Sequence, residues 1–336
     1  MARSRMSTAG GSGAGSAAFR REAQAAGRLS YPDVAAIAPI PSSRRYAPPM
    51  IEDRYSSLAA DHLPEALASR WTALLRPSAR LRRAVDGEEA VAVLGGVPDL
   101  PADVAWPEWP PHGPLSFVAS VDCAALPREA LVEPFPRGGA LLFFAFDGQA
   151  DSDAFVSLDT PEGQMGQRVL HIPHGTPVSP APTPPQLRAQ PRVGLVAEPE
   201  QSAPDLGLPP VRAALLGDTG DGGDWPDPRR APAELRPFLR AFNRLRGHIG
   251  HQFGGHALPI QGPVEYEVTY PDLGDTHSWG DRFHDEEAQR WLLLAQFEID
   301  AATETSYGDD RALYWLIRPE DLAARRFDRA RLTVQC

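Results

Sequence analysis

The chain has 336 residues, 42% of them hydrophobic, which is enough to bury the core of one large domain or two ordinary ones. Its 33 basic residues, all arginine, stand against 44 acidic residues, so the net charge is −11. Nucleic-acid binding needs a basic stripe, so we expect no nucleic-acid partner. No apolar run is long enough to span a membrane, no secretory signal is present, and the two cysteines cannot build a disulfide framework. We therefore expect a cytoplasmic protein without a membrane partner.

Residues 1–50 are rich in Ala, Gly, Ser and Pro without periodicity, which predicts a flexible N-terminal arm. Beyond it we expect a single globular domain over residues 54–336. Apolar residues from Leu63 to Leu75 recur at helical spacing and predict a helix that ends near Pro77. Residues 115–123 alternate between apolar and polar as a strand does, and the apolar run 140–146 is typical of a strand buried on both faces.

The second part of the chain begins with residues 173–232, which are dense in proline and predict an ordered but irregular insertion. Apolar residues at 3.6-residue spacing then predict an amphipathic helix from Leu235 to Leu245. After it we predict three strands, a short helix and a last strand. In sequence these are VEYEVTY (264–270), WLLLAQFEID (291–300), RALYWLI (311–317), PEDLAARRF (319–327) and ARLTVQ (330–335).

The two parts of the chain repeat one order of features. Gly95-Gly96 precede an alternating strand that carries Asp122, and an apolar strand follows. Gly254-Gly255 precede an alternating strand that carries Glu298 and Asp300, and again an apolar strand follows. We infer an internal duplication, with repeat one at about 92–158 and repeat two at about 251–335. The fold class that this predicts is α+β, with duplicated, mainly antiparallel β-sheet units and peripheral helices.

A histidine-rich stretch, GHIGHQFGGHALPIQG, occupies residues 247–262. On a strand His248 and His251 would face opposite sides, as would His251 and His256, and the glycines disfavour a helix. A zinc site needs about four converging ligands, so we expect no metal and no cofactor here. The histidines are then structural or lie at the surface, and replacing His256 by Ala would cost little. The alternative is that His251 or Gln261 contacts a polar ligand.

No GxSxG, HExxH or phosphate-binding glycine loop is present, so we assign no catalytic residue. The polar residues Ser120 and Asp122 of one strand could converge with Gln296, Glu298 and Asp300 of the other. Facing carboxylates could then bind a ligand or act as a general acid/base pair. The alternative is that they face water on an open antiparallel sheet.

Two tryptophans and a cysteine complete the candidates. Trp106 and Trp109, in WPEWPP, could recognise a partner, since exposed tryptophan favours interfaces, or they could belong to the core. Cys123 ends a predicted core strand and is best interpreted as an inert buried thiol rather than a nucleophile.

Several motifs occur together in one order: GGVPDLP, PLSFVASVD, GGALLFFAF, HQFGGHALPIQ, WLLLAQFEID and YGDDRALYWLI. In that order they resemble the YwqG-like family, a bacterial domain without an established biochemical function, over roughly residues 74–336. The resemblance implies an α+β fold built from a duplicated antiparallel unit, and it implies no reaction. This chain departs from the family pattern at Ser120, at Ala257 and at Tyr307-Gly308-Asp309.

Three hypotheses about function follow. The first is a protein-binding module of immunity or regulatory type that uses the Trp-Pro segment and an acidic surface, with a basic toxin or regulator as partner. The second is a small-molecule binder with a carboxylate-lined cleft between the repeats, and the third is a hydrolase in the same cleft. A pocket lined by acids favours the last two, whereas a flat polar sheet with exposed tryptophan favours the first. The candidate binding residues are Trp106, Trp109, Asp122, His251, Gln261, Gln296, Glu298, Asp300 and Asp309.

Overall fold

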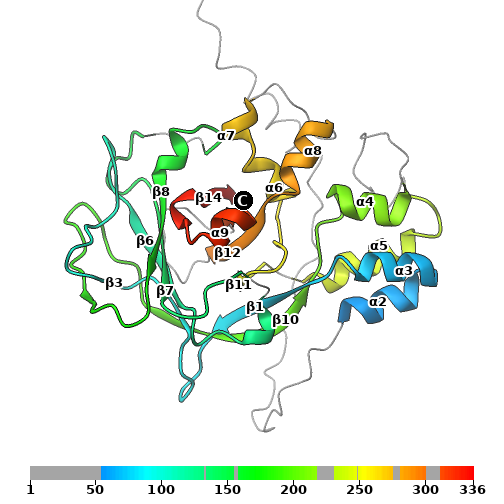
Figure 1. The fold of residues 1–336 in the computed structure, drawn as a ribbon, viewed down its shortest axis with the longest axis horizontal. Helices are drawn as coiled ribbons and strands as arrows, with labels where there is room; N and C mark the ends of the chain where they lie inside the picture. Colours follow the sequence, from blue (N-terminus) through cyan, green and yellow to red (C-terminus); the bar gives the residue numbers. More distant parts are fainter. Residues whose placement is uncertain are drawn as a thin grey trace, which may run out of the picture. The chain divides into compact units, whose positions relative to one another are not determined.

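A computed structural model of the chain describes residues 54–131, 134–154, 158–217, 231–247, 249–274, 281–299 and 311–336 (Figure 1). All of these residues belong to one unit, Met50–Cys336. A ten-stranded antiparallel sheet with helices beside it makes the fold α+β, as predicted. Within the described ranges, no helix is both long enough and apolar enough to cross a membrane.

The large sheet brings together segments that lie far apart in the sequence. Its strands, in spatial order, are β14 (Arg331–Gln335), β13 (Arg311–Ile317), β12 (Leu292–Ile299), β11 (His251–Phe253), β1 (Arg76–Arg83), β10 (Val193–Ser202), β2 (Ala92–Leu94), β6 (Ser116–Asp122), β7 (Ala140–Ala145) and β8 (Gln167–Ile172). Two small ribbons join β3 (Asp99–Leu100) to β9 (Ser179–Pro180) and β4 (Glu108–Trp109) to β5 (Gly113–Pro114). The strands predicted at β6, β7, β12, β13 and β14 are confirmed.

Four helices form a cluster of their own, drawn beside the sheet in Figure 1. They are α2 (Arg54–His62), α3 (Glu65–Thr72), α4 (Pro209–Leu216) and α5 (Arg236–Leu245). The cluster is centred on Trp71, whose ring meets those of Phe238 and Phe242 edge-on at 5.0 and 5.8 Å. The helix predicted at 235–245 is confirmed as α5. The helix predicted from Leu63 to Leu75 is α3, which begins after Pro64 and ends at Thr72, and the separate helix α2 precedes it.

Shorter helical segments lie against the sheet. These are α6 (Val264–Glu267), α7 (Tyr270–Leu273), α8 (Arg282–Ala288), α9 (Pro319–Ala323) and the 3₁₀ turns η1 (Arg128–Ala130), η2 (Gly163–Gly166) and η4 (Phe327–Arg329). The strand predicted at 264–270 is therefore wrong, because α6 and the start of α7 occupy it. Val264 and Val268 are four residues apart. This spacing fits one face of a strand, but it equally fits one face of a helix, and both residues are buried. Pro263, at the N-cap of α6, favours the helical start.

The proline-rich stretch 173–232, for which we predict irregular structure, contains β10 and α4. β10 lies at the centre of the sheet, between β1 and β2. Its sequence, VGLVAEPEQS, includes Pro199 and is only partly buried, so it carries neither the alternation nor the apolar run of an ordinary central strand.

The sheet curls until its two ends meet. Phe143 of β7 contacts Phe297 of β12 and Trp315 of β13, each at 5.2 Å between ring centroids, although these strands lie far apart in the sheet order. At the edges, the Gln167 amide donates to the carbonyl of Ala330 at 2.6 Å and accepts from Trp315 Nε1 at 3.2 Å. Side-chain amides thus link the β8 edge to the β14 edge, and the sheet is a nearly closed barrel around one apolar core.

The centre of the sheet is the pair of strands β1 and β10, where Arg82 lies opposite Val196. The strands on the two sides of this centre are paired in matching registers. On one side Arg80, Gln252, Gln296 and Tyr314 form a row of paired residues, and on the other Gly194, Val93, Ser120 and Leu142 form the corresponding row. We call β1 and β11–β14 the second half of the sheet, and β10, β2 and β6–β8 the first half.

The irregular features of the two halves also correspond. The β6–β7 ladder is interrupted at Val118 and the β12–β13 ladder at Leu294. The carbonyl of Val118 accepts a hydrogen bond from the Gly95 amide at 2.9 Å, and that of Leu294 accepts one from the Gly254 amide at 3.1 Å. Both Gly-Gly pairs have positive φ, which other residues rarely adopt.

Candidate functional site

A pocket lies between the two halves, at the end of the barrel where β6 begins and β12 ends. We call it the inter-half pocket. Its apolar walls come from Leu94, Phe117 and Val118 of the first half and from Phe297, Ile299 and Leu313 of the second. Ser116, Asp147, Gln190 and Glu298 also line it. Binding sites for small molecules commonly have this composition, a mainly apolar wall with a few polar groups.

The polar groups of the first half are held by a short network. The Gln149 amide donates to Asp147 Oδ2 at 2.7 Å and to Ser116 Oγ at 3.2 Å. The Gln149 carbonyl oxygen in turn accepts from the Arg188 amide at 2.8 Å. Asp147 is thus oriented by neutral donors, and it makes no ion pair with any residue that the structure describes.

Glu298 belongs to the wall that the second half of the sheet contributes to the same pocket. Its backbone amide donates to Nδ1 of His251 at 3.1 Å, so the histidine ring takes the place of a strand partner where β11 begins. Arg80 is close enough to interact with the Glu298 carboxylate: burial lowers the pKa of Arg80, and Glu298 partly offsets that effect. Among the candidates that the structure describes, Glu298 is thus the one that lines the inter-half pocket, and Arg80 interacts with it electrostatically.

The other predicted polar residues have local roles in the structure. Asp122 is exposed, and its Oδ1 accepts from the Ala124 amide at 2.8 Å at the end of β6. Gln296 is fully buried; its carbonyl oxygen accepts from the Leu258 amide at 2.9 Å, and its amide donates to the Gly250 carbonyl at 2.8 Å. Gln261 donates to the carbonyl of Cys336 at 2.6 Å. Asp300 and Asp309 lie outside the described residues.

The two tryptophans pack in the cluster that covers the first half. Trp109 is 6% exposed and meets Phe146 edge-on at 5.2 Å. Trp106 is half-buried against Phe144, and its Nε1 donates inward to the Leu115 carbonyl at 2.8 Å. This is the core-packing alternative, and the indole N–H of Trp106 is not available to a partner at the surface.

The histidines do not converge in the part of the chain that the structure describes. His248 lies outside the described residues, and no three His, Cys, Asp or Glu side chains of the described ranges form a group that could hold a metal ion. The expectation that His256 lies at the surface is wrong. Its side chain is 7% exposed and its Nε2 bonds to the Leu74 carbonyl at 2.8 Å, so burial lowers its pKa to about 3. Gly255 and His256 pack against the α3–β1 connection and the central strands β1 and β10 rather than facing water.

Cys123 is buried, and burial raises the pKa of its thiol to about 12. A thiol that stays protonated at neutral pH is a poor nucleophile, which agrees with the structural interpretation.

The sequence analysis missed two polar features. Asp147 was not singled out, although an acidic residue followed by glycine at the end of an apolar strand is a recognisable signal. Glu265 was assigned to a strand that does not exist, and it is instead 7% exposed with one carboxylate oxygen, Oε2, buried and without a hydrogen-bond partner. No pattern of spacing announces the burial of Glu265, because the neighbours Arg76, Asp205 and Arg246 come from distant segments.

Comparison with known proteins identifies the family. The chain belongs to the family of the domain of unknown function DUF1963, whose sequence model matches residues 92–336. The matched region begins at β2 and includes the whole inter-half pocket. A search of curated proteins found no match.

Proposed function

We propose that the protein binds a small apolar molecule carrying a positively charged amine in the inter-half pocket. The observation that carries this proposal is Asp147, a carboxylate without an ionic partner among the described residues, beside apolar walls from both halves. The apolar walls favour a hydrophobic body, and Asp147 and Glu298 favour a cation at its polar end. No basic residue lines the pocket.

The size of the expected ligand is suggested by the other half of the molecule. We infer that the two halves are copies of one unit, and the matching registers and Gly-Gly bends support this inference. Under the correspondence, Leu94 and Gly95 in the inter-half pocket match Phe253 and Gly254. There the ring of Phe135 packs on Phe253 at 5.4 Å between centroids, and Phe135 and Leu131 lie against Gly254. In the second half, the ring of Phe135 thus fills the place that corresponds to the inter-half pocket. The inter-half pocket therefore suits a ligand ring of similar size.

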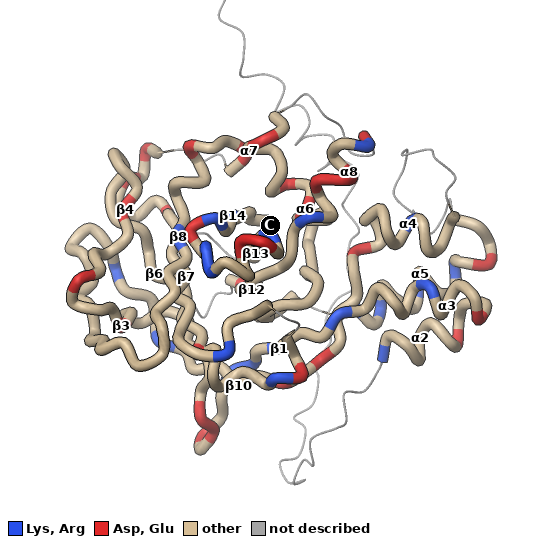
Figure 2. Tube along the Cα trace, in the orientation of Figure 1, with Lys and Arg blue, Asp and Glu red and all other residues tan. Residues whose placement is uncertain are grey.

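The protein-binding hypothesis has less support, because Trp106 and Trp109 pack inward. Its remaining support is acidic charge, which Figure 2 shows along α7 and α8 and in the β1–β2 connection. An immunity or regulatory role with a basic partner, a hydrolase activity, a cytoplasmic location and the narrower YwqG-like relationship all stay predictions from the sequence.

The test uses phenethylamine as the cationic aromatic probe and 2-phenylethanol as its neutral isostere, each titrated into the full chain by calorimetry. We expect phenethylamine to bind at least tenfold more tightly than the alcohol, because the ammonium gains a charge-assisted hydrogen bond to Asp147. Asp147→Asn should remove that preference. Asp153→Asn, at an exposed position outside the pocket, is the matched control and should bind as the natural chain does.

A second variant checks the place of binding. Val118 is half-buried and lines the pocket, so Val118→Trp should fill it and abolish binding of both probes, while circular dichroism reports whether the fold is kept. Equal affinity for the amine and the alcohol, or unchanged amine binding by Asp147→Asn, would contradict the proposal.

A further inference from the structure

A second pocket lies at the opposite end of β6 from the inter-half pocket, and we call it the basic pocket. It is lined by Cys123, Leu126, Arg128, Leu131, Phe135 and Arg137, which come from the end of β6 and the connection to β7. Leu126, Leu131 and Phe135 give it an apolar side, and its charged lining groups are both arginines. A pocket with two cationic groups is unusual on a chain whose net charge is −11.

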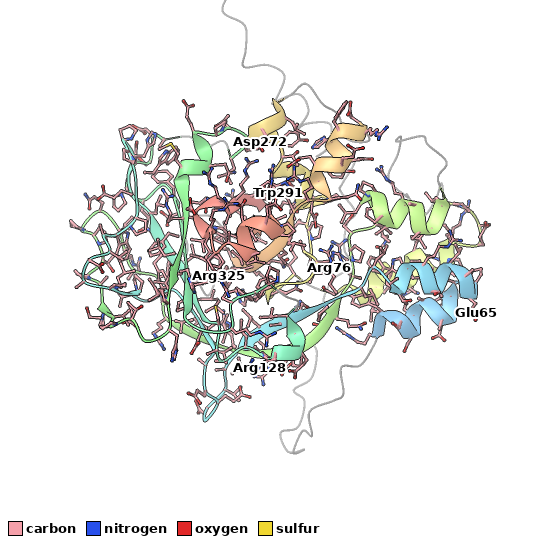
Figure 3. All side chains as sticks on the ribbon, in the orientation of Figure 1. Glu65, Arg76, Arg128, Asp272, Trp291 and Arg325 are labelled. Atoms are coloured by element: carbon pink, nitrogen blue, oxygen red, sulfur yellow. The ribbon has the colours of Figure 1, made fainter. Side chains whose placement is uncertain are left out.

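Arg128 has no ionic partner among the described residues. Other arginines of this fold are paired with acids, as Arg212 is with Asp285 at 2.7 Å and Arg246 with Asp205 at 3.0 Å. Arg128, labelled in Figure 3 beside η1, makes no side-chain hydrogen bond or ion pair with any residue that the structure describes. An arginine at the rim of a pocket and without a partner is available to an anionic ligand.

Arg325, also labelled in Figure 3, adds a third positive charge that acts on Cys123 of this pocket. Its guanidinium acts electrostatically on Cys123, which lines the pocket, and on His171 of β8. Within the described residues its side chain likewise makes no hydrogen bond or ion pair. Nε2 of His171 is buried without a hydrogen-bond partner, so the polar groups near this end of β6 are incompletely satisfied.

The backbone of Arg325 is in a conformation that arginine seldom adopts. It has φ of +58°, the one positive φ among the described non-glycine residues, at the turn that ends α9. The Arg326 amide bonds to the Asp321 carbonyl at 2.9 Å, the closing bond of a helix C-terminus where glycine is the usual residue. A charged side chain in place of glycine is costly for the backbone there, which points to a role for the side chain itself.

The described acids nearby, Asp122 and Glu129, do not neutralise Arg128 or Arg325. Asp122 precedes Cys123, but its carboxylate already accepts from the Ala124 amide. Glu129 is exposed and follows Arg128 in the 3₁₀ turn, and no ion pair joins the two. The basic pocket therefore combines an apolar side with Arg128, and with Arg325 close by, neither of which forms an ion pair with a described acid.

We propose that the basic pocket binds a small carboxylate with an apolar or aromatic body. Arg128 and Arg325 hold the carboxylate, since a planar guanidinium pairs with a carboxylate through two parallel hydrogen bonds. Leu126, Leu131 and Phe135 contact the apolar body. This ligand is opposite in charge to the amine proposed for the inter-half pocket, so the two sites are chemically independent.

The test titrates benzoate into the full chain while the methyl resonances of Leu126 and Leu131 are followed by NMR. Benzamide is the neutral isostere, and inorganic phosphate is an anion without an apolar body. We expect benzoate to shift both leucine resonances in a saturable way, benzamide to bind at least tenfold more weakly, and added salt to weaken binding of benzoate. Leu215, in the helical cluster, should not respond.

The arginine variants assign the site. Arg128→Gln combined with Arg325→Asn should weaken benzoate binding at least tenfold, and asparagine suits the positive φ at 325, so the fold should be kept. Arg282→Gln removes an exposed arginine of α8 as the matched control and should change nothing. Benzamide or phosphate binding as tightly as benzoate would overturn the proposal, as would an equal loss in Arg282→Gln or full affinity in the double variant.

Discussion

The two halves of the sheet share a register but are covered in different ways. The outer surface of the first half is packed by aromatic side chains, with Trp106 against Phe144 and Trp109 against Phe146. The second half is covered by the loop after Gly255 and by α6, and buried glutamine amides hold that cover in place. Among the described residues of 92–172, two polar side chains are buried, Ser116 and Gln167. Residues 251–269 and 284–335 bury many more.

Glutamine suits this second kind of cover because one side chain can both accept and donate. Gln252 donates to the carbonyls of Gly254 and His256 at 2.8 and 2.7 Å. Gln335 accepts from the amide of Ile260 at 2.8 Å and donates to the carbonyl of Gly262 at 2.8 Å. An irregular loop has backbone groups without a ladder partner, and these amides satisfy them where water is absent. The same arrangement of strands can therefore be covered either by aromatic packing or by amide hydrogen bonds.

We expect the largest difference in stability between the halves when the second glycine of each Gly-Gly pair, Gly96 or Gly255, is replaced. A Cβ at Gly255 would lie 2.4 Å from Ser202 Oγ and 2.6 Å from Ser78 Cβ, both on central strands. At Gly96 the nearest atoms would be 3.2 Å away, on the flexible side chain of Arg192. Both glycines have positive φ, so valine is strained at either position. We expect Gly255→Val to lower the free energy of unfolding by about 4 kcal/mol, and Gly96→Val by about 2 kcal/mol.

Urea denaturation of the two variants measures this difference directly. Equal losses would mean that the backbone strain dominates and that the close approach of Gly255 to Ser78 and Ser202 is relieved by small shifts.

The second prediction compares Gln296 with Ser120, which hold equivalent places in the two rows of paired residues. Gln296→Leu keeps the volume but leaves the Leu258 amide and the Gly250 carbonyl buried without partners. Such a loss costs about 1–3 kcal/mol for each unsatisfied group, so we expect the unfolding free energy to fall by about 3 kcal/mol. Ser120 is half-buried, and its side chain makes no hydrogen bond to a described residue. The control Ser120→Ala should therefore change the unfolding free energy by less than about 0.5 kcal/mol.

Hydrogen exchange adds a local measurement to the same comparison. The Leu258 amide should exchange much faster in Gln296→Leu, while amides of the first half keep their protection. A variant as stable as the natural chain would show that the cover of the second half is held by its apolar contacts alone.

The sequence predicted the regular parts of the fold because each carries its own periodicity. The apolar run 140–146 and the alternation in 291–300 are local properties, and both segments contain strands as expected, although in β12 the polar residue Gln296 is buried as well. The position of β10 could not be predicted in this way, because Gly194 and Pro199 interrupt its pattern and its place depends on pairing with β1 and β2. Glu298 was recognisable as a strand residue, but its place in the same pocket as Asp147 depends on how the sheet curls.

The last prediction concerns Glu265, the buried acid under the cover of the second half. Burial raises its pKa from the ordinary 4.5 to about 7, with Asp205 adding to the rise and Arg76 and Arg246 opposing it. Because folding raises the pKa of Glu265, its contribution to the unfolding free energy is fully present below pH 4.5 and is lost as the pH rises to about 7. His256 acts in the opposite sense: its pKa is lowered to about 3, so its contribution is present above pH 6.5 and is lost as the pH falls.

Because these two groups oppose each other between pH 4.5 and 6.5, the informative quantity is the difference between Glu265→Gln and the natural chain. Glutamine resembles the protonated carboxyl and does not titrate, and the contribution of His256 cancels in the difference. We expect the variant to match the natural chain within about 1 kcal/mol at pH 4.5 and to exceed its unfolding free energy by on the order of 2 kcal/mol at pH 8. Urea denaturation across this range gives the curve, with Glu129→Gln, an exposed acid of the first half, as the control that should stay flat. A difference that does not grow with pH would mean that the Glu265 carboxylate is compensated in the fold, by Arg76 above all.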